Sequence, residues 1–262
     1  MSEQLLHATL IAVAALVAGG GVLVARRFVP PESLRENNEF TGFTYAFVGL
    51  VYGVYLAFTV VIVWEHFAEA DNTASHEAIV LNELWRDTTA LPDHDDMHRH
   101  IYGYTRSVIV DEFPSMAAGK GAAAKTYAEY EAMWETLQST KLTPGDPVQQ
   151  AFYAEAVRQM NALTEHRRSR LLSGQADLPP LMWILLIAGG VGMVAFTYLI
   201  GTPHRWVQLV VTMFLAAMLT HAILIVASLL NPFDGDITVQ PSAYSAVLKS
   251  FDRQIADQSP VR

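Results

Sequence analysis

A regular series of polar side chains runs through an otherwise apolar segment near residue 50. Tyr45, Tyr52, Thr59 and His66 recur every seven residues, and Gly49 lies on the same side. Seven residues make about two turns of an α-helix, so these positions share one stripe. Polar groups inside a membrane cost free energy unless they face protein or water. The stripe therefore predicts either a close contact with another helix or the wall of an aqueous path.

Acidic side chains follow this stripe where the apolar segment ends. Glu65, Glu69 and Asp71 would form an acidic rim around a path if several copies of the chain stood in a ring. The alternative is an ordinary solvated face of a helix, which uses the same residue types. Both interpretations place these carboxylates outside the hydrocarbon.

A single histidine lies within the last apolar segment of the chain. His221 is flanked by apolar residues on both sides, in the run MLTHAILIV. An ionisable group at that depth in a membrane is a functional candidate by default. The alternative is a neutral, buried imidazole that is hydrogen-bonded to Thr220 or to a tyrosine of another helix.

A second group of histidines suggests a metal site. His94 and His98 are four residues apart, so they share a face on a helix, and Asp95 is adjacent. Zinc accepts these ligand types. The segment follows a proline, however, and Asp93 fits the capping position at the start of a helix. Capping explains the aspartates without a metal, so we predict no metal site and no other cofactor.

Several other kinds of chemistry find no support in the sequence. The chain has no cysteine, which excludes disulfides and thiolate metal sites. No nucleophile elbow, phosphate-binding loop or zinc-protease motif occurs, so we do not expect an enzyme. The formal net charge is −9 and no basic stripe is present, which argues against nucleic acid as a partner.

The composition is that of a membrane protein. Of the 262 residues, 52% are hydrophobic and 16% are charged, whereas about 25% are charged in a typical soluble domain. The apolar residues gather in four blocks, at 5–25, 43–64, 181–201 and 207–230. Each block has no Asp, Glu, Lys or Arg and is long enough to cross a bilayer, which takes about 20 residues. A soluble bundle would show polar stripes on most of its helices. We therefore predict four membrane-spanning helices.

The four blocks and the polar stretch between them define the expected organisation. Residues 1–66 form a first transmembrane hairpin, 67–178 a helical extramembrane domain, and 179–231 a second hairpin. Residues 232–262 form a tail with a short amphipathic helix. No strand-like alternation occurs in the polar stretch, so the protein should be all-α. The second block continues without proline into polar sequence, which predicts one long helix from about Phe43 to about Ala90.

Basic residues in the short loops predict the orientation of the chain. The first loop carries Arg26, Arg27 and Arg35, and the short third loop carries Arg205. Short loops rich in Lys and Arg stay in the cytoplasm. The insert and both termini should then lie outside the cytoplasm. A basic cluster at 167–170 argues for the opposite orientation, but long domains cross the membrane largely regardless of charge.

Several short motifs occur together in an arrangement typical of one family. They are LAF at 56–58, Trp64, LWR at 84–86, LP at 91–92, LPPLMW at 178–183 and NPFDG at 231–235. In these motifs the sequence resembles the bestrophin-like family of bacterial membrane proteins, over most of the chain. The second span is also similar, more distantly, to the bestrophin helix that lines an anion pore within a ring of subunits. Bestrophins have an Arg and an RWW-like run after LAF. This chain has Thr59 and one tryptophan there, so the resemblance does not extend to anion selectivity.

Together these observations predict an all-α integral membrane protein of the bacterial cell membrane. Its partners would be the lipid bilayer, further copies of the same chain and inorganic ions. The resemblance implies a homo-oligomeric channel that conducts ions passively along the second span. The alternative is a non-conducting sensor or scaffold whose extramembrane domain binds a partner.

Overall fold

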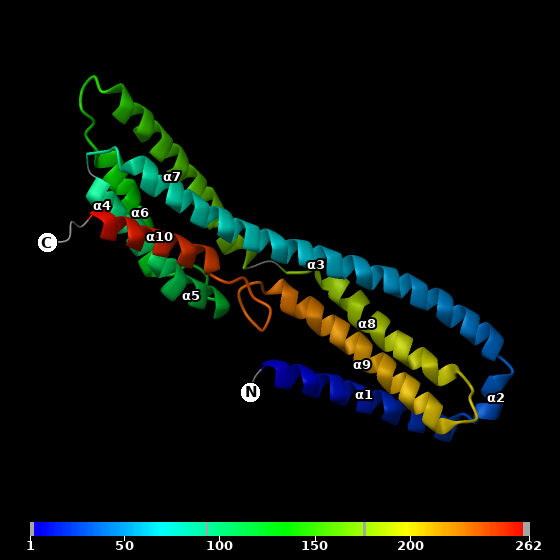
Figure 1. Cartoon of the computed structure of the whole chain (residues 1–262). Coiled ribbons are helices and arrows are strands. Elements are labelled where there is room, and N and C mark those ends of the chain that lie inside the picture. Colours follow the sequence, from blue (N-terminus) through cyan, green and yellow to red (C-terminus); the bar gives the residue numbers. More distant parts are fainter. Residues whose placement is uncertain (1–2, 93, 175–176, 259–262) are drawn as a thin grey trace. The chain divides into compact units, whose positions relative to one another are not determined.

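The computed structural model describes residues 3–92, 94–174 and 177–258. Every regular element in these ranges is a helix (Figure 1), which confirms the prediction of an all-α protein. The α-helices are α1 (Glu3–Phe28), α2 (Pro31–Arg35), α3 (Asn38–Thr88), α4 (His94–Ser107), α5 (Phe113–Ala117), α6 (Ala124–Ser139), α7 (Pro147–Ser173), α8 (Pro180–Phe196), α9 (Arg205–Leu230) and α10 (Ser242–Gln258). A π-helix, η1 (Val108–Glu112), and a 3-10 helix, η2 (Thr197–Leu199), complete the set.

Four stretches of helix are long and apolar enough to cross a membrane, as predicted. They are Gln4–Phe28, Asn38–Thr88, Pro180–Leu199 and Arg205–Leu230. The second is the continuous helix α3, which has 51 residues and contains no proline. The predicted long helix is therefore confirmed, with its start at Asn38 rather than near Phe43.

The chain divides into two compact units. The spanning unit contains residues 1–65 and 177–230, and the insert unit contains residues 66–176 and 231–262. Helix α3 contributes its apolar first half to the spanning unit and its polar second half to the insert unit. The segment after the last span therefore belongs with the polar insert.

In the spanning unit, α9 packs against both α1 and α8 (Figure 1). The contact with α1 is close because a glycine lies at the crossing: a side-chain carbon at Gly19 would stand 3.0 Å from the sulfur of Met213. Small residues allow helices to approach closely in lipid, where van der Waals packing holds them together. Nearby, the side chain of Arg26 binds Gln208 Oε1 and the carbonyl oxygen of Thr202, each at 2.7 Å. These bonds fix the end of α1 on the loop before α9.

The start of α3 is fixed by a reciprocal pair of hydrogen bonds. The amide nitrogen of the Asn38 side chain donates to the carbonyl oxygen of Gly201 at 2.7 Å, and its oxygen accepts from the backbone N–H of Gly201 at 2.9 Å. One side chain therefore satisfies both backbone groups of a residue between η2 and α9. This contact positions the first turn of the second span.

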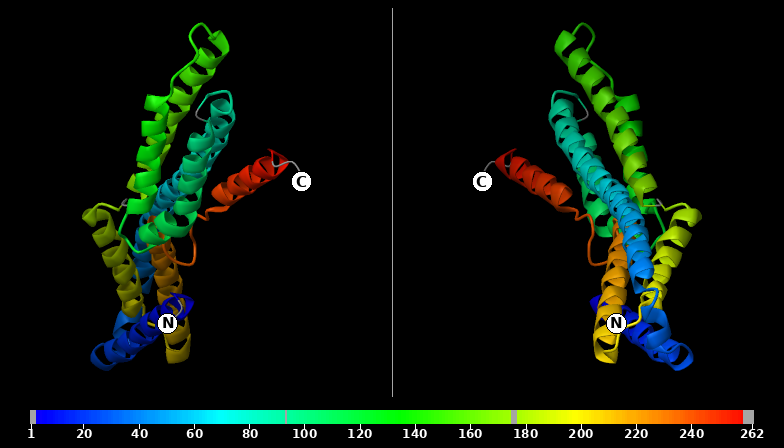
Figure 2. Two further views of the ribbon diagram at one scale, coloured as in Figure 1. Left: turned by 90° about the vertical axis from the view of Figure 1, so that its left-hand side faces the viewer. Right: turned by 90° about the vertical axis from the view of Figure 1, so that its right-hand side faces the viewer.

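In the insert unit, α4 lies between two groups of helices. Figure 2 shows α6 and α7 on one side of it and α10 on the other. The core is apolar, with Leu81 of α3, Ile101 of α4, Met133 of α6 and Leu163 of α7 fully buried. Helix α7 starts where Asp146 accepts hydrogen bonds from the first backbone N–H groups, and a proline occupies its first position.

Helix α10 attaches to the insert unit through a stack of three rings. Trp85 lies between Phe251 of α10, with ring centroids 4.2 Å apart, and His98 of α4, at 3.8 Å. Tyr244 and Phe251 are both fully buried, so the apolar face of α10 points into the core. Burial lowers the pKa of His98, which favours the neutral ring in this stack.

Candidate functional site

The polar stripe of the second span faces helix α8 of the same chain. Tyr52 is buried, and its hydroxyl donates to the carbonyl oxygen of Leu186 at 2.8 Å. Its ring lies directly on Gly189, where a side-chain carbon would stand 2.5 Å from a ring carbon. One stripe position earlier, the ring of Tyr45 packs on Phe196, with centroids 5.9 Å apart.

Gly49 and Thr59 of the stripe, and Tyr55 beside it, also contact their own chain. A side-chain carbon at Gly49 would stand 3.1 Å from Met193 of α8. The hydroxyl of Tyr55 donates to the carbonyl oxygen of Met182 at 2.7 Å. Thr59 is only 1% exposed, and its hydroxyl donates to the carbonyl oxygen of Tyr55 at 2.9 Å. The hydroxyls of Tyr52, Tyr55 and Thr59 thus have acceptors inside the spanning unit.

These contacts bear on the two interpretations of the stripe. Within the chain Tyr45, Gly49 and Tyr52 contact α8 and Thr59 is buried, as expected for a helix contact, and a role of these residues in a pore wall between copies stays a prediction. A backbone carbonyl satisfies a hydroxyl in lipid without any water. A seven-residue spacing shows which residues share a face, not which neighbour that face meets.

The opposite face of α3 is left uncovered by its own chain. Phe47 is 62% exposed, Val54 49% and Phe58 66%, and Glu65 is exposed as well. These positions are seven, four and seven residues apart, so they form one helical stripe that runs from aromatic and aliphatic groups to a carboxylate. Sequence analysis named Glu65 but missed Phe47, Val54 and Phe58, because the exposed apolar residues of a span cannot be told from the buried ones before its packing is known.

The remaining polar candidates near this end of α3 belong to the insert unit. His66, Glu69 and Asp71 are all exposed. Exposure is compatible with both earlier interpretations, a rim around a path and a solvated helix face. The acidic rim therefore stays a prediction.

His221 is exposed on α9. It follows Phe214 and Met218, which are 68% and 52% exposed, along the same face of the helix. Among the described residues it makes no hydrogen bond, and Thr220 beside it lines a cavity instead. A hydrogen bond to Thr220 or to a tyrosine belonged to the alternative interpretation, and none is present among the described residues. Its role stays a prediction.

His94 and His98 lie near each other, with ring centroids 5.8 Å apart. Each already has a backbone partner: His94 Nδ1 is 3.1 Å from the carbonyl oxygen of Leu91, and His98 Nε2 is 2.9 Å from that of Trp85. No group of three or more metal-binding side chains occurs in the described ranges. Asp93, the proposed capping residue, lies outside the described residues.

A network of four buried charges lies in the insert unit. Arg170 donates from Nε to Glu77 Oε2 and from Nη2 to Glu112 Oε1, both at 2.7 Å, and Arg167 donates to Glu112 Oε2 at 2.9 Å. Glu77, Glu112 and Arg170 are fully buried, and Arg167 is 8% exposed. Two carboxylates balance two guanidinium groups, so the cluster carries no net charge. Buried charges are tolerated when they are paired and hydrogen-bonded in this way.

Aromatic side chains complete this network. The hydroxyl of Tyr104 donates to Glu77 Oε1 at 2.6 Å, and Arg170 lies between the rings of Phe113 and Tyr244, at 5.7 and 5.8 Å. Burial raises the pKa of both tyrosines well above the ordinary value, so both stay neutral. Burial alone would lower the pKa of Arg170, but the charge of Glu77, its hydrogen bond and the neighbouring tyrosines together raise that pKa, so the guanidinium stays protonated.

The π-helix η1 brings Glu112 into the network. Glu112 is its last residue, and Oε2 also accepts a hydrogen bond at 3.1 Å from the backbone N–H of Ala123, just before α6. A π-turn inserts one residue into a helix and is frequently found where a side chain must be redirected for a purpose. Here it lets one carboxylate bind two arginines and the start of a further helix.

Sequence analysis missed the network because it treated 167–170 only as basic residues near a span. One signal was available: Glu77 interrupts the small and apolar positions Ala70, Ala74, Ala78 and Leu81 of α3, all of which are buried. A lone carboxylate on such a face requires a cationic partner. Its partner lies 93 residues further along the chain, and spacing cannot identify it.

Comparison with known proteins identifies the family to which this fold belongs. A family model described as the bestrophin-like domain matches residues 12–244. This match confirms the resemblance inferred from the LAF, LWR, LPPLMW and NPFDG motifs. A search of curated proteins gave no match.

Solved structures of bacterial proteins have the same fold at low identity. A bestrophin homologue from Klebsiella pneumoniae, solved by Zn-SAD phasing, superposes with a TM-score of 0.67 and 13% identity, over 94% of this chain and 97% of that one. A point variant of the Klebsiella pneumoniae homologue gives 0.68 and 12%, over 96% and 99%. At these identities the comparison establishes the fold alone.

The contact between α3 and α8 can be tested by matched glycine substitutions. Gly189→Ala places a carbon 2.5 Å from the buried ring of Tyr52, whereas Gly192→Ala on the same helix meets nothing within 4 Å. Overpacking typically costs about 1–3 kcal/mol, so the first variant should melt earlier in detergent. The second should match the wild type. Equal melting temperatures for the two variants would show that Tyr52 does not rest on Gly189.

The buried network predicts a large difference between two neighbouring arginines. Arg170→Met leaves two buried carboxylates without their shared partner, and breaking such a pair costs about 3–5 kcal/mol. Arg168 is exposed, so Arg168→Met should be within about 0.5 kcal/mol of the wild type. Circular dichroism should show the insert helices of the Arg170 variant melting roughly 10 °C lower. Similar melting of both variants would contradict a structural role for the network.

Proposed function

Because this chain belongs to the bestrophin-like domain family, we propose that it is an ion channel assembled from several copies in a bacterial membrane. The observation that carries this proposal is the family match over residues 12–244, together with the four-span helical fold. Conduction would be passive. We propose no enzymatic activity.

The spanning unit supports an assembly of several copies. Its four apolar blocks contain no Asp, Glu, Lys or Arg, and the hydroxyls of Tyr52, Tyr55 and Thr59 are bound within the chain. These groups of one copy therefore offer ions no polar path. A path between copies needs an exposed helix face, and α3 has one.

We assign the wall of the path to the exposed face of α3 rather than to its polar stripe. Phe47, Val54 and Phe58 would form an apolar constriction, of the kind that controls conduction by dewetting. Glu65, on the same face, would stand at one end of it and favour cations electrostatically. The ion that this protein conducts is left open.

The competing function is a non-conducting sensor or scaffold. In that case the exposed face of α3 would contact lipid or a partner helix, and the insert unit would bind another protein. The two functions differ in one measurable property, which is ion flux across a bilayer that contains only this protein.

Three substitutions test the wall. In liposome flux assays with K⁺ and Cl⁻, Phe58→Ala should raise the flux because it removes a ring from the constriction. Phe214→Ala is the matched control, since Phe214 on α9 is 68% exposed and Phe58 is 66% exposed, and its flux should equal that of the wild type. Thr59→Phe overfills a buried contact at a cost of about 1–3 kcal/mol and should reduce the yield of assembled protein first.

Mass and flux together decide between the two functions. A detergent-solubilised species of one 28.9 kDa chain, with no flux in liposomes, would remove the channel and leave the sensor. Flux that responds equally to Phe58→Ala and Phe214→Ala would place the path elsewhere.

The orientation remains part of the proposal, with the insert and both termini outside the cytoplasm. The natural chain has no cysteine, so single cysteines can be labelled without background. Lys120→Cys lies in an exposed turn of the insert unit, and His204→Cys in the exposed loop before α9. A membrane-impermeant maleimide applied to spheroplasts should label the first directly and the second only after lysis. The reverse pattern would invert the topology.

A further inference from the structure

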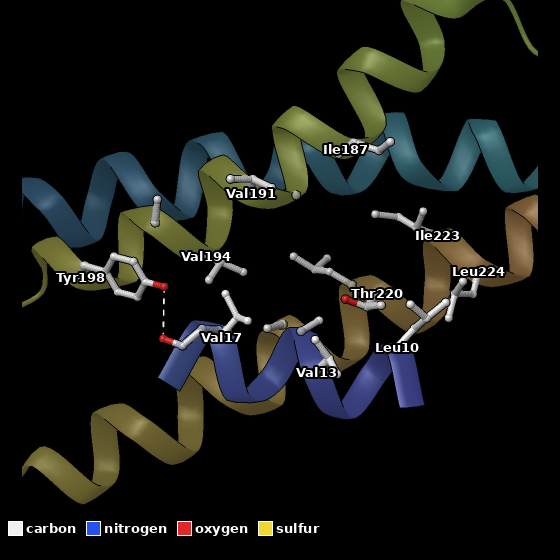
Figure 3. A pocket seen from close by; sticks show the side chains of 16 residues that line it. Leu10, Val13, Val17, Ile187, Val191, Val194, Tyr198, Thr220, Ile223 and Leu224 are labelled. Carbon is white, nitrogen blue, oxygen red and sulfur yellow. Dashed lines mark hydrogen bonds between the residues drawn. The ribbon is translucent and has the colours of Figure 1, made fainter. Parts of the chain in front are cut away.

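A cavity of about 570 Å³ lies within the spanning unit, between α1, α8 and α9 (Figure 3). Leu10, Val13 and Val17 of α1 form one wall, Val194 lies on α8, and Ile223 lies on α9. All three helices are long and apolar enough to span a membrane, so the cavity lies at the depth of the hydrocarbon. It is separate from the exposed face of α3.

The lining excludes ions and ordered water as occupants. Only Tyr198 and Thr220 bring a polar side-chain atom to it, and the hydroxyl of Tyr198 already donates to the carbonyl oxygen of Ala18 at 3.1 Å (Figure 3). A buried water needs about two to four polar partners. The hydroxyl of Thr220 alone cannot supply them, and no charged group is present. The cavity is therefore suited to an uncharged, apolar occupant.

The dimensions suit an extended hydrocarbon chain. The lining part of α1 runs from Leu10 to Ala18, which is about 12 Å at 1.5 Å per residue. An acyl chain is much narrower than a helix with its side chains, which is about 10–12 Å wide.

One end of the cavity is closed. Tyr198 bridges from η2 to α1 at Ala18, and beyond it α1 packs tightly on α9, where a side-chain carbon at Gly19 would stand 3.0 Å from Met213. The other end is bordered by Leu10 and Leu224, and Leu10 is 41% exposed. The cavity is also open along its side, where Val13, Val17 and Val191 are 50%, 69% and 64% exposed, so an occupant enters laterally from the surrounding lipid.

From this geometry we propose that the cavity binds the acyl chain of a membrane lipid. The surrounding membrane supplies such chains at high concentration, and the lining offers them apolar contact along nearly its whole length. The site falls within the size range of ordinary ligand pockets, with one free hydroxyl among apolar walls. The bound chain joins α1 to α8, which otherwise meet mainly through η2.

The site is tested by photolabelling in vesicles. The full chain is reconstituted into phosphatidylcholine whose acyl chain bears a diazirine, irradiated, digested and analysed by mass spectrometry. Label should concentrate on the walls at Val13, Val17, Val194 and Ile223. Ala14→Phe fills the cavity and should reduce this label several-fold. Ala12→Phe, exposed on the same helix outside the cavity, should not.

A second variant guards against a folding defect. Ala195→Phe fills the cavity from α8 and should give the same loss of label, while melting temperatures show that each variant is folded. Label spread evenly over exposed positions such as Phe214, and unchanged by both filling variants, would mean only contact with the bilayer surface and would overturn the site. Wall residues without any label would overturn it as well.

Discussion

The pairing of Glu77 with Arg170 is the interaction on which the insert unit depends. Two charges without water are unstable unless each finds its opposite at hydrogen-bonding distance, so the network permits little variation in geometry. It connects α3, α7 and η1, and through Glu112 it also fixes the start of α6. An apolar core of Leu and Met tolerates small shifts of its helices. The buried ion network does not, and it therefore determines how these helices are arranged.

The spanning unit solves a similar problem with weaker groups. Its hydroxyls bind backbone carbonyls, its glycines allow close crossings, and no full charge is buried among its apolar blocks. Helix α3 takes part in both arrangements: Tyr52 rests on α8 in one unit, and Glu77 binds Arg170 in the other. The uninterrupted helix predicted from the sequence thus carries two kinds of hydrogen-bonding residue. In the spanning unit a hydroxyl binds a backbone carbonyl, and in the insert unit a carboxylate binds an arginine.

Sequence patterns predicted what depends on composition and local propensity. Four apolar blocks gave four spans, and a proline-free run gave the long helix. They failed where a result depends on which neighbour a side chain meets. The stripe from Tyr45 to Thr59 was identified, but its partner α8 was not. The network joins residues 93 positions apart, and the cavity lies between three helices from distant parts of the chain, which no local pattern encodes.

The π-helix that ends at Glu112 has a consequence for how related sequences are aligned. A π-turn holds one residue more than an α-turn over nearly the same rotation, so it takes up an inserted residue within one turn and leaves the helix on either side in place. A homologue one residue shorter between Val108 and Glu112 therefore keeps the carboxylate directed at both arginines and at Ala123. A one-residue gap in an alignment of this segment belongs within residues 108–111 and does not require a change at Arg167 or Arg170.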